Sequence, residues 1–214
     1  MARAIARMGF GTDVEMIAEN LASPRAVKAV AECDVVFGCM DGVEGRHLLN
    51  RLAAFYVQPY FDVGVRLEAN GQGGIDDASG AVFYIKPDGS TLHDRNVYDF
   101  EQLRAAGLRR TDPEVYREQI KAGYIRGVAE DRPAVISINM QMASTAVNEF
   151  LARLHPYRLD DNGNFATIRT SFMQGVDYVE RDAAASGMFF AHIGKGDVRP
   201  LLSMPYINET EETT

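Results

Sequence analysis

The residues best suited to chemistry in this chain follow one apolar run, residues 34–40. Asp41 comes directly after that run, and Gly42, Arg46 and Asn50 come next. If the run is a strand of an open α/β sheet, Asp41 lies at the carboxyl end of that strand, where such sheets bind ligands. A carboxylate there could hold Mg²⁺, and Gly42 would let backbone approach a ligand closely. Arg46 and Asn50 are four residues apart, so on a helix they share a face and could lock the loop around Asp41.

Each of these residues also has a simpler structural interpretation. Asp41 could cap the helix that follows it, which is a common role for aspartate. Arg46 could lie on a solvated helix face. Gly64 ends the next apolar run, and it could be a turn glycine or let a ligand approach. Spacing alone leaves these alternatives open.

Other catalytic and metal-binding patterns are absent from the sequence. The four histidines do not fall at metal-ligand spacing and there is no CxxC pair, so we expect no structural zinc. No serine lies in a G-x-S-x-G elbow, and the glycines of residues 71–74 are not followed by the Lys-Ser/Thr of a phosphate-binding loop. The G-x-G-x-x-G fingerprint of a dinucleotide-binding unit is also missing.

The elements that must position Asp41 follow the alternation of an open α/β sheet. After a helix over residues 2–8, we expect a strand over 14–17, a helix from Ser23-Pro24, a strand over 34–40, a helix after Gly42 and a strand over 59–65. The continuous apolar character of residues 34–40 predicts burial on both strand faces and makes Cys39 a small buried hydrophobe. This order predicts an α/β fold with a Rossmann-like, mostly parallel sheet flanked by helices.

Beyond residue 70 the pattern changes. A strand over 81–85 with the turn Pro87-Asp88-Gly89 predicts an antiparallel hairpin extension, and a further strand is expected over 165–172. Short helices are expected near Asp99 and after a capping box at Thr111 and Glu114. A longer helix opened by Pro133 should bury one apolar stripe, formed by Ile136, Met140, Ala143, Val147, Phe150, Leu151 and Leu154.

Size and charge limit the function classes. The chain has 214 residues and a net charge of −8, which fits one globular domain over 1–207 with a disordered acidic tail over 208–214. An acidic surface argues against nucleic acid and anionic membranes as partners, and no apolar stretch is long enough to span a bilayer. Cys33 and Cys39 would lie too far apart along a strand for a disulfide, which favours a cytoplasmic location.

Four motifs follow one another in a recognisable order. They are C-D-V-V-F-G-C-M-D with R-x-x-L-N behind it (33–50), P-Y-F-D-V-G (59–64), G-A-V with P-D-G (80–89), and P-A-V-I-S-I-N running into A-S-T-A-V-N-E-F-L (133–151). Together they resemble the ThiF/MoeB/HesA family of E1-like adenylyltransferases, over about residues 14–154.

The resemblance implies MgATP binding and activation of a carboxylate by adenylation, often at the C-terminus of a ubiquitin-like or sulfur-carrier protein. It implies that Asp41 lies at the ATP and magnesium site, that Gly42 is beside it, and that Arg46 and Asn50 lie behind it. Residues 89–132 would cover the substrate tail. A homodimer is also expected, because family members often dimerise and an incomplete sheet exposes an edge.

The chain departs from the family's pattern in its amino-terminal part. The family's glycine-rich loop, acidic ribose ligand and phosphate-binding Arg and Lys have no counterpart, and no cysteine in 89–132 could form a thioester. We therefore expect the amino-terminal nucleotide-binding half to be missing and the chain alone to have little or no adenylation activity, because the reaction needs cations around the α-phosphate. Two alternatives are a non-catalytic ThiF-like protein-binding module that docks a partner through 89–132, and half of an NAD(P)-binding oxidoreductase.

Overall fold

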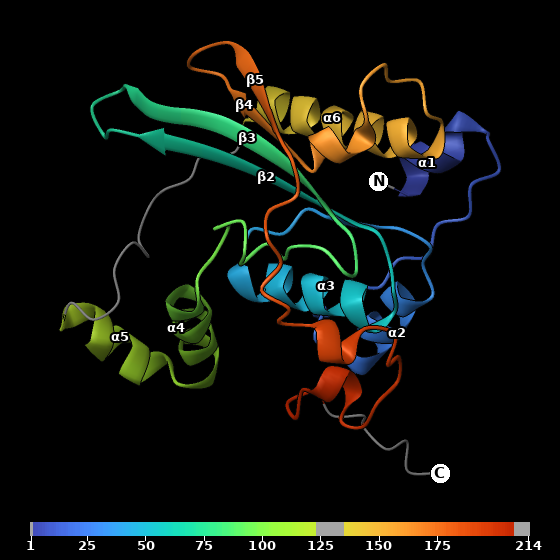
Figure 1. Ribbon diagram of the computed structural model, residues 1–214. Helices are drawn as coiled ribbons and strands as arrows, with labels where there is room; N and C mark the ends of the chain where they lie inside the picture. Colours follow the sequence, from blue (N-terminus) through green and yellow to red (C-terminus); the bar gives the residue numbers. More distant parts are fainter. Residues whose placement is uncertain (1, 123–134, 208–214) are drawn as a thin grey trace.

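The computed structural model describes residues 2–122 and 135–207 (Figure 1). The expected helix start at Pro133 and the tail over 208–214 lie outside the described residues. The helices are α1 (Ala2–Met8), α2 (Pro24–Ala31), α3 (Val43–Phe55), α4 (Phe100–Thr111), α5 (Pro113–Lys121) and α6 (Ile136–Leu154). The strands are β1 (Val36–Gly38), β2 (Tyr60–Ala69), β3 (Ile75–Ile85), β4 (Thr167–Ser171) and β5 (Val176–Glu180), and 3-10 turns lie at Asn162–Phe165, Phe190–His192 and Leu201–Ser203.

The strands form one mixed sheet in the order β1-β2-β3-β4-β5. β1 and β2 pair in parallel, with Gly38 opposite Asp62, and the other neighbours pair antiparallel. Helix α6 packs on β2 and β3, while α3 packs on β1 and β2 from the other side of the sheet (Figure 1). The α/β class, the flanking helices and the antiparallel hairpin are confirmed. The parallel part is smaller than expected, because within the described residues it consists of the β1–β2 pair.

Two strand predictions at the start of the chain need correction. Residues 14–17 form no strand, and Val14 and Met16 are exposed. The strand predicted over 34–40 is limited to β1, which lies at the edge of the described sheet, beside β2. An edge strand is covered less completely than a central one, so Phe37 is 40 % exposed instead of buried.

Local capping explains where the helices begin. The Ser23 hydroxyl accepts a hydrogen bond from the backbone N–H of Ala26, and Pro24 occupies the first turn of α2, as the sequence predicts. Asp99 and Gln102 form a reciprocal capping box at the start of α4. The box expected at Thr111 and Glu114 is wrong by one residue, because Asp112 is the residue that caps α5.

The main core lies between α3 and the sheet. Leu48, Leu49, Leu52 and Phe55 of α3 are buried against Tyr60, Ile85 and the C-terminal residues Leu201, Leu202 and Ile207. The buried guanidinium of Arg95 donates to the carbonyls of Tyr84 and Ala166 and pairs with Asp182 at 2.9 Å. This arginine therefore joins β3, the start of β4 and the segment after β5 into one unit.

The buried stripe predicted on α6 is wrong. Ile136, Met140 and Leu154 are 76 %, 63 % and 57 % exposed. The residues of α6 that face the sheet are instead Met142, Ala146, Glu149 and Ala152. Met142 fits this face because Gly80 of β3 leaves room for it, and a Cβ at Gly80 would lie 2.5 Å from the Met142 side chain. Buried Glu149 is compensated by ion pairs with Arg153 and Arg158.

Candidate functional site

Asp41 is exposed just beyond the carboxyl end of β1, directly before α3. The N-cap residue of α3 is Gly42, and α3 has no side-chain cap, so Asp41 is not the capping residue. The first N–H groups of α3 therefore keep their capacity to bind an anion, and the helix dipole favours negative charge there. A carboxylate beside a bare helix N-terminus can hold a cation and an anion together, as a magnesium–phosphate ligand requires.

Arg46 faces the protein rather than the solvent. Its Nε donates to the backbone carbonyl of Met40 at 3.0 Å and lies 3.5 Å from the Asp62 carboxylate. Its Nη2 atom lies 2.8 Å from the position a Cβ on Gly64 would take. Gly64 is therefore needed for Arg46 to pack across β2. The arginine thereby fixes the loop that carries Asp41.

Sequence reasoning did not select the carboxylate that holds Arg46. Asp62 has no exposed surface, and it accepts a hydrogen bond from the Tyr60 hydroxyl at 2.6 Å. Burial raises the pKa of Asp62, while Arg46 and the Tyr60 hydrogen bond oppose that rise. The signal available in the sequence was a charged residue inside the apolar strand over 59–65, since such residues are rarely buried without a partner.

Cys39 lies at the same end of β1 and is exposed, which corrects the expectation of a buried hydrophobe. Partial burial raises the pKa of its thiol, and the negative charges of Asp62 and Asp41 raise it further. These effects keep the thiol protonated, which makes it a poor nucleophile.

A magnesium ion fits this end of β1 better than a protein-ligated metal does. Among residues 2–122 and 135–207, no three His, Cys, Asp or Glu side chains gather into a metal-ligand set. Mg²⁺ needs fewer protein ligands, since it usually takes one or two carboxylates together with water and phosphate oxygens. Asp41 is exposed and can supply one such carboxylate.

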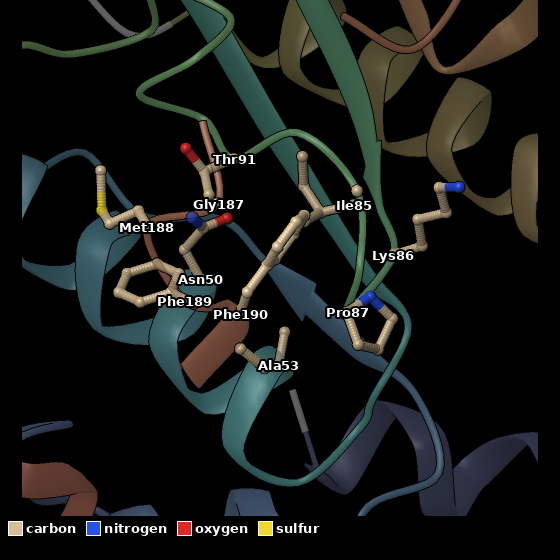
Figure 2. Close-up of a pocket in the computed structure, with 12 residues that line it drawn as sticks. Asn50, Ala53, Ile85, Lys86, Pro87, Thr91, Gly187, Met188, Phe189 and Phe190 are labelled. Carbon is tan, nitrogen blue, oxygen red and sulfur yellow. The ribbon is translucent and has the colours of Figure 1, made fainter. Parts of the chain in front are cut away.

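Asn50 lies one turn further along α3, against a separate small cavity (Figure 2). Its side chain is 2 % exposed, and within residues 2–122 and 135–207 neither its amide nitrogen nor its oxygen has a hydrogen-bond partner. The cavity measures about 10 Å³, which is room for about one water. It is lined by residues of β3 and the following turn, by Thr91 and by residues 187–190. The structure thus brings Gly42 and Arg46 to Asp41, while the Asn50 amide faces a different space.

His47 lies in the core beneath the site. Its Nδ1 is 3.0 Å from the Tyr98 hydroxyl, and its ring meets the Tyr98 ring edge-on. Burial, with a further contribution from the positive charges of Arg51 and His93, lowers the pKa of His47 to about 4. His47 is therefore a neutral packing residue at pH 7.

Comparisons with known proteins agree with this geometry. The model of the ThiF family matches residues 1–186. A search of curated proteins found no match. Similar solved structures include E. coli MccB with AMPCPP and MccA (TM-score 0.57, 13 % identity) and with ATP (TM-score 0.56, 13 % identity). Each alignment covers 86 % of this chain and 47 % of the MccB chain, so this chain spans about half the length of those proteins. At such identity the likeness shows a shared fold. None of the described helices is both long and apolar enough to cross a bilayer.

Proposed function

The chain belongs to the ThiF family, and on that premise we propose that the carboxyl end of β1 forms part of the MgATP site of an E1-like adenylyltransferase. The observation that carries the proposal is the position of Asp41. This carboxylate is exposed at a strand end, does not cap α3, and lies on a loop that Arg46 fixes from below. Open α/β sheets bind nucleotides at the carboxyl ends of their parallel strands.

Each residue has a distinct role in this proposal. Asp41 would hold Mg²⁺, and the ion would neutralise charge on the phosphates of ATP. Gly42 leaves the N–H groups at the start of α3 open to a phosphate oxygen. Arg46 acts as a positioning residue, since Met40 and Asp62 occupy its guanidinium. The resemblance assigns Asn50 a place behind the site, and in the structure its side chain lines the separate small cavity.

We infer that the substrate is a carboxylate at the end of a peptide or carrier protein. The similar MccB structures support this class, because one of them holds AMPCPP together with MccA and another holds ATP. A ubiquitin-like or sulfur-carrier protein belongs to the same class. The chain carries no glycine-rich loop and no phosphate-binding Lys in that family position, so we propose that the chain alone does not adenylate. Free, exposed Cys33 and Cys39 suit a reducing compartment, and we place the protein in the cytoplasm.

A second candidate function is a non-catalytic module that binds a partner protein. The α4–α5 helix pair favours it, because α4 buries no residue and α5 buries Tyr116 as its one residue. Figure 1 shows this pair extending away from the sheet. Phe100 and Ile120 are exposed on it. A partner that binds this pair without nucleotide would support the module over the enzyme.

Calorimetric titration with MgATP tests the proposed site. We expect binding that Asp41→Ala abolishes and that Asp34→Ala leaves intact, since Asp34 is an exposed carboxylate just before the other end of β1. Titration with NADH should give no heat of binding, which would exclude the oxidoreductase alternative. Equal binding by the two alanine variants, or preference for NADH, would reject the proposal.

A further inference from the structure

The chain contains two asparagine–glycine pairs, Asn70-Gly71 and Asn162-Gly163. In such a pair the backbone nitrogen of the glycine can attack the side-chain amide carbon of the asparagine and close a succinimide ring. Glycine favours this attack because it has no Cβ to shield the nitrogen and because its backbone adopts conformations closed to other residues. Whether a pair reacts in the fold therefore depends on how its nitrogen and its amide are held.

Asn70 and Gly71 begin the turn over residues 70–74, which joins β2 to β3. Figure 1 shows this turn at the tip of the hairpin, away from α2 and α3. Both residues are exposed, Gly71 has a φ of +72°, and a Cβ on it would meet no atom within 4 Å. In the part of the chain that the structure describes, the Gly71 N–H donates to no partner. The attacking nitrogen is therefore accessible and unoccupied.

The amide oxygen of Asn70 is held by backbone donors of the same turn. Its Oδ1 accepts hydrogen bonds from the N–H groups of Gln72 and Gly74, each at 2.9 Å. The Asn70 N–H donates to the Gly74 carbonyl at 3.0 Å and closes the loop. Attack on the amide carbon moves negative charge onto Oδ1, and N–H donors aimed at such an oxygen stabilise the transition state of acyl transfer. The turn thus places an oxyanion hole on its own asparagine.

We propose that Asn70 is a site of spontaneous deamidation, promoted by the turn that contains it. The Gly71 nitrogen gives its proton to water and bonds to the Cγ of Asn70. The side-chain nitrogen takes up a proton and leaves as ammonia. Water then adds to one carbonyl of the succinimide and breaks the C–N bond there, so that opening at one carbonyl gives aspartate and opening at the other gives isoaspartate. The reaction consumes water, releases ammonia and involves no oxidation or reduction.

The second pair, Asn162-Gly163, is held in a way that opposes the same reaction. Asn162 is half-buried, and its Nδ2 donates to the Ala152 carbonyl at 3.0 Å. The Gly163 N–H donates to the Asp161 carboxylate at 2.6 Å. The Arg158 guanidinium donates to the Asn162 Oδ1 at 3.0 Å, but an activated amide does not react without a free nucleophile. Asn162 therefore serves as a control inside the same chain.

Deamidation alters both the charge and the path of the turn. It adds one negative charge to a chain whose net charge is −8, near Glu68 and Asp77, which lie opposite one another on β2 and β3. The aspartate product keeps an acceptor for the N–H groups of Gln72 and Gly74. In the isoaspartate product the main chain runs through the former side chain, so the contacts of Oδ1 are lost and the hairpin tip must rearrange.

Peptide mapping of the aged full chain by mass spectrometry tests the proposal. We expect the peptide that contains Asn70 to gain the mass of an amide converted to an acid, and to split into aspartate and isoaspartate forms. Asn162 should react at least ~10-fold more slowly, because its side-chain hydrogen bonds and that of the Gly163 N–H must break first. Comparable rates at the two asparagines of the folded chain would overturn the proposal.

The same chain in guanidinium chloride separates the effect of the turn from that of the local sequence. Unfolding should bring the two pairs to similar rates, so it speeds the reaction at Asn162 and slows it at Asn70. In the folded chain, Gly71→Ala should slow the reaction at Asn70 at least ~10-fold by shielding the nitrogen, whereas Gln72→Ala keeps the N–H donor and should change the rate little. Circular dichroism checks that both variants fold. A faster reaction at Asn70 in the unfolded chain, or equal rates in the two alanine variants, would contradict promotion by the turn.

Discussion

Removing the Arg46 side-chain charge should destabilise the fold in a way that depends on pH. Arg46→Met keeps most of the side-chain volume, but among the described residues it leaves Asp62 with Tyr60 as its remaining partner and removes the donor to the Met40 carbonyl. Breaking a buried ion pair by removing one partner costs roughly 3–5 kcal/mol. The retained Tyr60 hydrogen bond puts the expected loss near the lower end, at about 3 kcal/mol at pH 8.

The sign of the pH dependence follows from the raised pKa of Asp62. A carboxyl whose pKa is higher in the fold than in the unfolded chain destabilises the fold above the folded pKa. The lost stability returns as the pH falls from the pKa of the carboxyl in the fold toward its pKa in the unfolded chain. Loss of Arg46 removes an interaction that lowers the pKa of Asp62, so the folded pKa rises further in the variant. Arg46→Met should therefore cost less at pH 5 than at pH 8.

Urea unfolding followed by circular dichroism measures both effects. Asp62→Asn should rescue part of the loss in the Arg46→Met background, because it removes the uncompensated charge. Arg104→Met removes an exposed ion pair with Glu101 and should cost less than about 1 kcal/mol. Equal losses for Arg46→Met and Arg104→Met, or additive effects of Arg46→Met and Asp62→Asn, would refute the reasoning.

Three further predictions concern the core and the helix termini. The pKa of His47 is about 4 in the fold and near its ordinary value of about 6.5 in the unfolded chain. Its contribution to the free energy of unfolding is therefore complete above about pH 6.5, and up to about 3 kcal/mol of it is lost as the pH falls toward 4. His47→Gln should flatten urea-measured stability over that window, and an unchanged slope would contradict this. Gly64→Ala should displace Arg46 and cost about 1–3 kcal/mol, whereas Gly107→Ala in α4 meets no atom within 4 Å and should be neutral or stabilising in thermal melts. Asp99→Ala removes the capping box of α4 and should cost about 1 kcal/mol, measured by the same melts.

Local patterns predicted the elements around the site well, because those elements depend on neighbours in the sequence. Ser23 and Pro24 start α2 through one side-chain hydrogen bond and a fixed backbone angle. The turn at Pro87-Asp88-Gly89 closes with a hydrogen bond from the Gly89 N–H to the Lys86 carbonyl. The position of Asp41 at a strand end follows from the same local rules.

Features that depend on distant contacts were not predictable. Helix α6 has two apolar faces, and the spacing of apolar residues does not tell which of them packs on the sheet. The face that packs there is the one whose Met142 fits beside Gly80 of β3. The contact of Asp62 with Arg46 could not be predicted from local patterns, because it depends on the parallel pairing of β1 and β2 that sets Asp62 opposite Gly38. The second sheet edge, β5, has five exposed residues and no strong apolar signal, so it was missed.

The most direct test of the central claim is to locate a bound metal–nucleotide by NMR. Mn²⁺ replaces Mg²⁺ at carboxylate and phosphate ligands, and it broadens amide signals close to the ion. With MnATP, the account predicts broadening centred on the amides of residues 39–46 and of Gly64, and its loss in Asp41→Ala. Broadening centred on another acidic surface, or the same broadening in Asp41→Ala, would contradict a nucleotide site at the end of β1.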